Sequence, residues 1–520
     1  MILFSVIVIR YLRRLGYSVN GYSNRLPKEP RLASSAVITR YVNGDVEMLM
    51  GLRHPEVPTF PEFWAFPGGG VSPQDRKFSD GRIFLAGREE GASIVTLFRE
   101  LAEETGFVLD TGGEWMVVSD SIRKRLCTDN TAWAEAIDEG IFTIDERLAS
   151  LVTERTTPPL APVRYTNRFY HIHFGRADIE PKHPPGRSEF TQFKWWAPEE
   201  LLSEWQYGRA RMAPPQVTFV RDIVEQSIDG EGVLSTLSKM SKIPPMGRHK
   251  IEFAPGVECL PIPTATLPPA THTNCFIIGR GKKVLIVDPA IQNQEGFEIL
   301  RRRLVELQGE GKTVMGVLYT HKHPDHVGDQ SMIKVLLDGQ ILASAETIEE
   351  IGCGTEIADG QVIDLLDGYP WTVIETPGHC PGMVSLVSEM GVLSADNVTM
   401  VGTILVPSKD GSMTKYFGSL ERLKALRPKL LFPSHGPVCA SPDRLLGRTI
   451  NHRKQRHERI LKAIQSGIHS LAEITLEAYQ DSPDAPVALS RDQALSHING
   501  LIEQRLVIES DDGYIALSQQ

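Results

Sequence analysis

The sequence has little of what marks a disulfide-stabilised or a membrane-spanning protein. Only 6 of its 520 residues are cysteine, and they are scattered singly without a Cys-x-x-Cys pair. Such usage is typical of a reducing compartment and argues against a disulfide framework. The apolar run at 1–9 is too short to cross a bilayer, and its arginines follow it, whereas a secretory signal carries its positive charge first. We therefore expect a cytoplasmic protein without stable membrane insertion. The Arg-containing leader is also compatible with import into an organelle.

An excess of positive charge is also missing. The chain carries 55 Lys and Arg against 65 Asp and Glu, a net charge of −10. This balance argues against a protein that mainly coats nucleic acid, because such proteins need a strongly basic surface. No internal repeat or low-complexity tract stands out. The hydrophobic share of 41% and charged share of 23% are typical of a globular protein. The length predicts two or three domains, since it exceeds what one core organises.

The most informative segment is the run from His321 to His326, which reads His-Lys-His-Pro-Asp-His. It follows the apolar run at 314–319, which predicts a buried strand. A loop at the end of a strand can turn several of these side chains toward one metal ion. Divalent zinc binds neutral imidazole and carboxylate, and a hydrolytic zinc site keeps one position open for water. Three His and one Asp at this spacing are hard to explain as ordinary core residues.

Three segments downstream repeat this pattern. They place His379 in the Gly- and Pro-rich turn 376–382, Asp396 after an apolar run, and His435 after another. With Asp288 in Val-Asp-Pro as the first element, they resemble the metallo-β-lactamase superfamily between about residues 250 and 440. The resemblance implies an αββα sandwich and a hydrolase with two zinc ions.

The same resemblance implies a ligand set of three residues for each zinc ion and one bridging carboxylate. These are His321, His323 and His379 for one ion, Asp325, His326 and His435 for the other, and Asp396 between them. Asp288 would orient ligands from outside the set. A hydroxide between the two metal ions would be the nucleophile, and Asp325 would take part in catalysis.

A carboxylate-rich segment upstream carries a different chemistry. Apolar residues at 94, 97, 98 and 101 predict a helix. Glu100, Glu103 and Glu104 share one face of it because they stand at i, i+3 and i+4. Oxygen ligands of this kind suit Mg²⁺ or Mn²⁺ bound together with substrate phosphates. Gly106 is predicted to end the helix. For the three Glu alone, a solvated acidic face is the alternative.

Residues 99–107 match the second half of the Nudix box, and residues 66–71 match the first half. Asp75 stands where the family usually has Glu, and an insertion separates it from Arg99. The chain from 33 to 205 thus resembles the Nudix branch that includes peroxisomal coenzyme A diphosphatases. This implies an α/β/α domain with a mixed sheet. Its catalytic residues would be Glu100 and Glu104, and Glu100, Glu103 and Glu104 would bind Mg²⁺ or Mn²⁺. Asp75 and the insertion leave open whether the domain cleaves a substrate or only binds nucleotide.

The last 70 residues form a third pattern. Residues 450–465 predict a basic helix, two further helical patterns follow at 470–478 and 491–503, and an Asp-Gly turn at 512–513 predicts a hairpin. Three helices and a hairpin predict a winged-helix module. A metallo-β-lactamase core with this module resembles the lactamase-β-2-like family, which includes a mitochondrial single-strand endoribonuclease and fungal thioesterases acting on acyl carrier proteins. The basic stretch at 452–462 is predicted to contact a phosphate-bearing substrate or partner, with Arg453, Arg456, His457 and Lys462 on a common side and a solvated surface as the alternative.

These patterns give an α/β multidomain protein. The predicted segments are an N-terminal tail at 1–32, a Nudix domain at 33–207, a linker with a helix at 208–248, a metallo-β-lactamase domain at 249–445 and a winged-helix-like domain at 446–520.

The predicted function is that of a bifunctional metal-dependent hydrolase. The zinc site would cleave thioesters of coenzyme A or carrier proteins, and the Nudix site would cleave diphosphates of coenzyme A or nucleotides. The partners would be phosphate-bearing small molecules. One alternative is a single-strand endoribonuclease that binds RNA. Another is a zinc hydrolase whose Nudix domain only senses nucleotide. The sequence does not choose the substrate of either domain or the oligomeric state.

Overall fold

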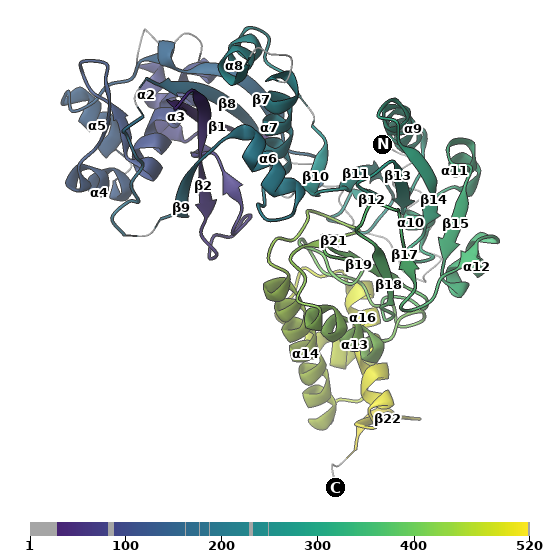
Figure 1. The fold of residues 1–520 in the computed structure, drawn as a ribbon. Coiled ribbons are helices and arrows are strands. Elements are labelled where there is room, and N and C mark those ends of the chain that lie inside the picture. Colours follow the sequence, from purple (N-terminus) through teal and green to yellow (C-terminus); the bar gives the residue numbers. More distant parts are fainter. Residues whose placement is uncertain are drawn as a thin grey trace. The chain divides into compact units, whose positions relative to one another are not determined.

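The computed structural model describes residues 29–517 apart from 82–87, 130, 162, 176, 187, 228–231 and 248. The described chain divides into two compact units with the boundary between Pro255 and Gly256 (Figure 1). Nearly all of the predicted tail at 1–32 lies outside the described residues. Within the described part of the chain, no helix has the length and apolar character needed to span a bilayer.

The first unit is built on a mixed seven-stranded sheet. Its main path runs in the spatial order β3 (Trp64–Ala65), β2 (Asp45–Arg53), β1 (Arg31–Val42), β8 (Tyr165–Phe174) and β7 (Ser150–Thr156). The short β4 (Gly68–Gly70) pairs with β1, and β9 (Phe190–Trp196) pairs with β2. β1 and β8 are parallel, whereas β2 and β7 are antiparallel to their neighbours. The predicted mixed sheet is therefore present.

Alternate residues of these strands face two separate cores, as the two-residue period of a strand requires. In β1, Ile38 belongs to one core and Val37 to the other. The first core is covered by α3 (Arg88–Glu100), α4 (Asp120–Thr128) and α5 (Ala132–Asp138). The second is covered by α6 (Pro198–Gln206), α7 (Pro214–Ser227) and α8 (Gly232–Lys242). The unit is thus an α/β/α sandwich.

The structure changes the expected role of residues 208–248. They were predicted to form a linker with a helix, but Val217, Val220 and Ile223 of α7 and Leu237 of α8 lie buried in the second core. The sequence shows the helical spacing of these apolar residues, but it does not show that they pack on the sheet of the first unit. The segment belongs to the first unit, which ends with β10 (Ile251–Ala254).

The second unit contains two sheets. One runs in order through β11 (Val257–Pro263), β12 (His272–Ile278), β13 (Lys283–Val287), β14 (Thr313–Leu318), β15 (Gln340–Ala343) and β16 (Thr355–Glu356). The other runs through β17 (Val362–Ile363), β18 (Trp371–Glu375), β19 (Val384–Ser388), β20 (Gly391–Ala395) and β21 (Leu431–Pro433).

Helices cover the outer faces of both sheets. Apolar residues of α9 (Gln294–Gly309) and α11 (Gln330–Leu336) pack on the first sheet, where α12 (Ala345–Ile351) also lies beside β14 and β15. Those of α13 (Met413–Ala425) and the first turns of α14 (Pro442–Gln465) pack on the second. The Phe276 and Phe432 rings meet edge to face between the sheets. This is the αββα layering expected from the sequence.

The chain ends in a small helical module, named here the C-terminal module (residues 442–516). It comprises α14, α15 (Leu471–Ala478), α16 (Val487–Glu503) and the hairpin of β22 (Val507–Ser510) and β23 (Gly513–Ala516). Ile460, Ile474, Ile498 and Val507 form its core. The three helices and the hairpin occur where the sequence predicted them. The predicted boundary at 445/446 falls inside α14, because this one helix packs both on the second sheet and in the module.

Candidate metal centre

The residues predicted to bind zinc follow strands that end at one edge of the two sheets. β13 and β14 are parallel, so Asp288 and His321 come after the same end of that sheet. β18 and β20 point the same way because both are antiparallel to β19, and β21 is parallel to β20. His379, Asp396 and His435 therefore follow one edge of the second sheet.

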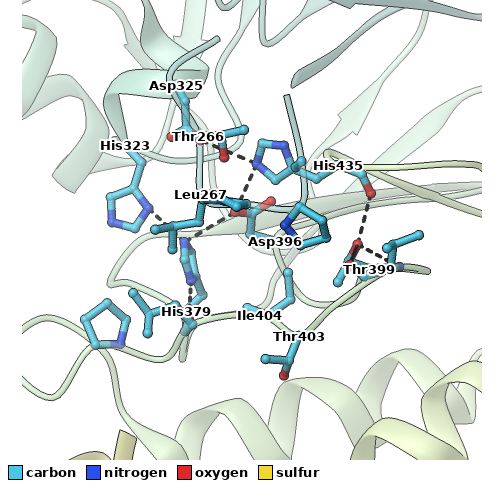
Figure 2. A pocket seen from close by; sticks show the side chains of 16 residues that line it. Thr266, Leu267, His323, Asp325, His379, Asp396, Thr399, Thr403, Ile404 and His435 are labelled. Carbon is cyan, nitrogen blue, oxygen red and sulfur yellow. Dashed lines mark hydrogen bonds and ion pairs between the residues drawn. The ribbon is translucent and has the colours of Figure 1, made fainter. Parts of the chain in front are cut away.

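The Asp396 carboxylate lies at the middle of this cluster. Its Oδ2 atom is 3.5 Å from Nε2 of His379, 3.5 Å from Nε2 of His435 and 3.7 Å from Nε2 of His326. Figure 2 shows His379 and His435 approaching Asp396 from different sides. Asp396 therefore occupies the position that a ligand shared by two metal ions would need.

Two groups of ligand atoms flank this carboxylate. In each group, one atom from each of three residues lies within 4.8 Å of the others. The groups are His321, His323 and His379 on one side, and Asp325, His326 and His435 on the other. The structure thus brings together all seven residues predicted from the sequence, which are named here the His-rich centre.

Two histidines of the centre donate their Nδ1 hydrogens to backbone carbonyls. His379 Nδ1 is 2.6 Å from the Leu405 oxygen, and His435 Nδ1 is 3.0 Å from the His272 oxygen. A carbonyl can only accept, so the proton must be on Nδ1. Nε2 of both imidazoles consequently faces the centre. There, Nε2 of His379 accepts a hydrogen bond from His323 Nδ1 at 2.8 Å.

Asp288 orients two more histidines. Its carboxylate is 3.0 Å from His326 Nδ1 and accepts hydrogen bonds from the Thr320 hydroxyl and amide at 2.6 and 2.8 Å. Since the Thr320 hydroxyl donates to Asp288, it accepts from His321 Nδ1 at 3.0 Å. This buried chain keeps Nε2 of both histidines facing the centre.

Asp410 lies beside the fifth histidine, and the sequence did not predict it. Its Oδ2 atom lies 3.7 Å from His323 Nε2, while Lys322 donates to Oδ1 at 3.0 Å. His323 and Lys322 lower the pKa of Asp410 to about 2. Asp410 follows no strand and no motif, so only its contact in the fold reveals it.

The centre contains buried polar atoms that no hydrogen bond satisfies. They are Nε2 of His321, His326 and His435, and Oδ1 of Asp396. An unpaired buried polar atom costs about 1–3 kcal/mol, and four of them around one space are explained if cations bind there. Imidazole and carboxylate at this density fit a pair of divalent ions.

The electrostatics of the centre also fit cation binding. Burial lowers the pKa of His321 and of His379, the latter to about 4, so both are neutral and able to coordinate. Burial also lowers the pKa of His326, but the carboxylates of Asp396 and Asp325 outweigh it and raise the pKa to about 10. Without metal, a proton on His326 therefore balances charge that a cation would balance instead.

A pocket opens over the His-rich centre and encloses about 600 Å³, including open solvent. His323, Asp325, His379, Asp396 and His435 contribute to its lining (Figure 2). Its walls come from residues 266–270 and from the irregular segment 399–407. They are mostly apolar: Leu267, Pro268, Pro269, Ala270, Val401, Ile404, Leu405 and Pro407. The lining, all from described residues, includes no Lys or Arg.

The upstream carboxylates form a second cluster, in the first unit, named here the carboxylate cluster (Asp75, Glu100, Glu103 and Glu104). Arg99 lies among three of them, 2.9 Å from Asp75, 2.8 Å from Glu100 and 3.0 Å from Glu103. Asp75 also caps α2 (Pro73–Asp80) together with Ser72. The shorter Asp therefore still reaches Arg99 across the insertion.

Backbone contacts hold the rest of this cluster. The helix predicted at 94–106 is α-helical to Glu100 and then makes one π-helical turn, Leu101–Thr105, closed by Gly106 in the left-handed region. Glu104 accepts from the Gly68 amide at 2.7 Å. A Cβ at Gly69 would overlap the Glu100 carboxylate. Gly69 thus allows the Glu100 carboxylate to approach the backbone, while Gly68 allows β4 to lie close to the backbone of Ser34.

The three predicted Glu ligands do not converge on one point. Within the described residues, the groups of three close ligand atoms all belong to the His-rich centre, because Glu103 turns to Arg99 and Glu104 to Gly68. Burial raises the pKa of Glu103 to about 7, and burial and Glu100 raise that of Glu104 well above its usual range. The cluster is therefore short of positive charge, which a cation would supply.

The prediction that the basic helix contacts phosphate is wrong for Arg453 and Arg456. Both lie on α14 but are only 3% and 5% exposed. Arg453 donates to Gln493, Thr403 and Ile404, and Arg456 donates to Ala478 and pairs with Asp481. The sequence shows the charge of this helix, whereas its burial depends on packing that the sequence does not display.

Comparison with known proteins finds one family similar to part of the second unit. Residues 268–347 match the family model of the Metallo-beta-lactamase superfamily. Beta-lactamase-like protein 2 homolog from Drosophila melanogaster is 28% identical over 202 residues, 36% of this chain and 67% of that protein. A hydroxyacylglutathione hydrolase from Erythrobacter litoralis is 26% identical over 208 residues, 39% of this chain and 75% of that protein. An atrochrysone carboxyl ACP thioesterase from Aspergillus fumigatus is 26% identical over 198 residues, 37% of this chain and 60% of that protein.

Two solved structures are similar to parts of the chain. A metallo-beta-lactamase family protein from Thermus thermophilus has a TM-score of 0.41 at 19% identity and covers 50% of this chain and 99% of its own. A NUDIX hydrolase from Alicyclobacillus acidocaldarius has a TM-score of 0.34 at 24% identity and covers 40% of this chain and 98% of its own.

Proposed function

Because the chain carries a metallo-β-lactamase domain whose relatives include hydrolases, we propose that the second unit is a dinuclear zinc hydrolase of thioesters. The thiol part would be coenzyme A or a carrier protein. The observation that carries the proposal is the His-rich centre, in which Asp396 lies between two groups of three ligands and lines a pocket with mostly apolar walls. Two of the relatives are named for hydroxyacylglutathione and for a carrier-protein thioester.

The residues of the centre divide the work among them. Each ion would be held by one of the two groups of three, with Asp396 shared. Two bound zinc ions supply a water of lowered pKa and polarise the carbonyl that it attacks. Asp325 lines the pocket and can accept a hydrogen bond from the attacking water. Asp288, Asp410 and the two carbonyls keep the imidazoles aimed throughout the reaction.

The pocket favours an acyl group over an RNA strand. Its walls offer Leu, Val, Ile and Pro side chains against which a hydrocarbon chain can be buried. Binding of single-stranded RNA needs a cationic groove with stacking aromatics, and the pocket lining has neither Lys nor Arg. The burial of Arg453 and Arg456 removes two of the cations on which the RNA alternative depended.

For the first unit we propose a Nudix-type diphosphatase acting on coenzyme A or related nucleotide diphosphates. The supporting observation is that Arg99 still pairs with Asp75 and Glu103 despite the insertion, and so links the two halves of the box. Glu100, Glu103 and Glu104 would bind Mg²⁺ or Mn²⁺, and Glu100 and Glu104 would act in catalysis. Hard cations suit such oxygen ligands and bridge to substrate phosphates.

A hydrolysis panel on the whole protein tests both proposals. Acyl-coenzyme A, acyl carrier protein, free coenzyme A, nucleoside diphosphate derivatives and single-stranded RNA would each be incubated with zinc alone and with Mg²⁺ or Mn²⁺. We expect thioester cleavage with zinc and diphosphate cleavage with the hard cations. Cleavage of RNA without any thioester cleavage would replace the thioesterase proposal with the endoribonuclease alternative. Nucleotide binding without cleavage would make the first unit a sensor.

A further inference from the structure

The irregular segment 403–410 connects the C-terminal module to the His-rich centre. It contains no helix or strand, so its backbone groups need partners from elsewhere in the fold. On one side its residues Thr403, Ile404, Leu405 and Pro407 line the pocket. The Leu405 carbonyl holds His379, and Asp410 lies 3.7 Å from His323. Two histidines that face the same ion are thus supported by one short segment.

Buried side chains of the C-terminal module hold the other side of this segment. Gln493 on α16 pairs with both backbone groups of Val406, accepting from its amide at 3.3 Å and donating to its carbonyl at 2.8 Å. Arg453 on α14 donates to the Ile404 carbonyl, to the Thr403 hydroxyl at 2.9 Å and to Gln493 at 3.1 Å. Nearby, Asp492 accepts from the Ser408 hydroxyl at 2.6 Å.

The burial of Arg453 and Gln493 indicates that these side chains contribute by fixing the backbone of segment 403–410, not by presenting charge to a ligand. Arg453 is 3% exposed and Gln493 is 7% exposed. A guanidinium is expensive to bury, and this cost is tolerated where its hydrogen bonds fix something in place. What Arg453 fixes is the backbone directly before Leu405, whose carbonyl sets the tautomer of His379, while Gln493 fixes the backbone directly after it.

We propose that Arg453 and Gln493 are positioning residues of the zinc hydrolase: from the C-terminal module they fix segment 403–410, and through it His379, His323 and the pocket wall. This inference rests on the proposed metal-dependent function of the second unit. It gives the C-terminal module a role in catalysis that does not require contact with nucleic acid or phosphate. It also explains why the basic run of α14 turns one of its arginines toward this segment.

Arg456 offers a matched control. It lies on the same helix and is equally buried, but its guanidinium binds the Ala478 carbonyl and Asp481 within the C-terminal module and does not contact segment 403–410. If the arginines only stabilise the module, the Arg453→Met and Arg456→Met variants should behave alike. If Arg453 positions the segment, only its loss should reach the metal centre.

The test uses the full chain loaded with Co²⁺, whose visible absorption reports the geometry of its ligands. Arg453→Met and Gln493→Met should change that spectrum, weaken Co²⁺ binding about tenfold and lower kcat/KM for the thioester about tenfold, as outer contacts of metal ligands typically do. Arg456→Met should keep the spectrum and kcat/KM within about twofold of the unaltered protein, even where its Tm falls.

Two outcomes would overturn the inference. One is an unaltered spectrum and kcat/KM in both Gln493→Met and Arg453→Met. The other is an equal change in Arg456→Met. Gln493→Met keeps the size of the side chain and adds no charge, so it remains informative if Arg453→Met does not fold. If the unaltered protein binds Co²⁺ but cleaves no thioester, while the spectrum still changes in the two variants, the proposed function fails and the positioning role stands.

Discussion

The two ligand clusters of this chain are prepared for metal ions in opposite ways. In the His-rich centre, four of the five histidines are held from outside through Nδ1, and the metal-facing atoms of His321, His326 and His435 have no hydrogen bond. In the carboxylate cluster, the acidic side chains already have partners, since Glu103 binds Arg99 and Glu104 binds the Gly68 amide. In the first site the outer contacts leave most ligand atoms facing an ion, with one hydrogen bond between His379 and His323 to be replaced. In the second site the carboxylates themselves must exchange their contacts to receive an ion.

The difference follows from ligand chemistry. An imidazole has two nitrogens, so one can form a hydrogen bond with the protein while the other faces the metal site. A neutral imidazole can also be buried without a metal ion at a lower free-energy cost than a charged group. Buried carboxylates repel one another unless a cation lies among them. Arg99 supplies that cation in the absence of metal, and the raised pKa of Glu103 and Glu104 indicates that it does not suffice.

The largest effect that would test this comparison is the loss of a histidine ligand. We expect His323→Ala to reduce thioester hydrolysis at least about 100-fold, because an open coordination position costs more than the loss of an outer contact. Any diphosphatase rate should be unchanged, since the carboxylate cluster lies in the other unit. Rates with zinc and with Mn²⁺, and the bound zinc per chain, would be measured on the same preparation.

His469→Ala provides a matched control, because His469 is exposed in the C-terminal module and binds the Tyr514 carbonyl, away from the His-rich centre. Loss of both activities in His323→Ala, with the fold retained, would contradict the existence of two independent sites.

A smaller effect is expected from the carboxylate cluster. Glu104→Gln keeps the size of the side chain and an oxygen that can accept from Gly68, but it removes the charge that a hard cation needs. The rate of diphosphate cleavage should fall about 10- to 100-fold, with a higher Mg²⁺ or Mn²⁺ requirement. Thioester hydrolysis should not change. Titration of the rate against Mn²⁺ measures both quantities, with exposed Glu114→Gln as the control.

If Glu104→Gln cleaves diphosphate as fast as the unaltered protein, Glu104 is not a ligand. If the unaltered protein cleaves no diphosphate at all, the contacts of Arg99 and Gly68 represent the working state of a binding module.

The two clusters were not equally open to prediction from sequence. The seven residues of the His-rich centre come from short motifs at strand ends, where local order decides which side chains can converge. The groups that contact these histidines from outside do not come from motifs. The Leu405 carbonyl, the His272 carbonyl and Asp410 lie in distant segments that show no pattern in the sequence. The carboxylate motif located its residues, but the sequence does not reveal that Arg99 would occupy the space among them.

The fold shows the same division. The family resemblances implied the mixed sheet and the αββα layers, and the structure contains both. Periodicity and turn residues predicted the helices and the hairpin of the C-terminal module, which are also present. They misplaced α7, α8 and the arginines of α14. Amphipathic or charged spacing shows that a helix has one distinct face, but it does not show which part of the fold that face contacts. For Arg453 the partner is an irregular segment 50 residues earlier in the chain.

Asp288 tests how far the His-rich centre depends on its outer contacts. We expect Asp288→Asn to lower kcat/KM for the thioester and the affinity for zinc by about 10-fold or more. The carboxylate is buried and serves both His326 and, through Thr320, His321, so water cannot replace it. Zinc affinity would be measured by competition with a chromophoric chelator. Unchanged affinity would mean that the imidazoles are aimed by packing alone.

The smallest effect is expected at Asp410, the other acidic support. Its side chain is 29% exposed and lies 3.7 Å from His323, against 3.0 Å between Asp288 and His326. Water can therefore take over part of its role, and Asp410→Asn should reduce kcat/KM and zinc affinity by less than about tenfold. The exposed Asp443→Asn on α14 is a suitable control, since Asp443 lies outside the pocket lining. An effect at Asp410 as large as that at Asp288 would show that exposure does not rank these supports, and that segment 403–410 controls His323 as tightly as Asp288 controls His326.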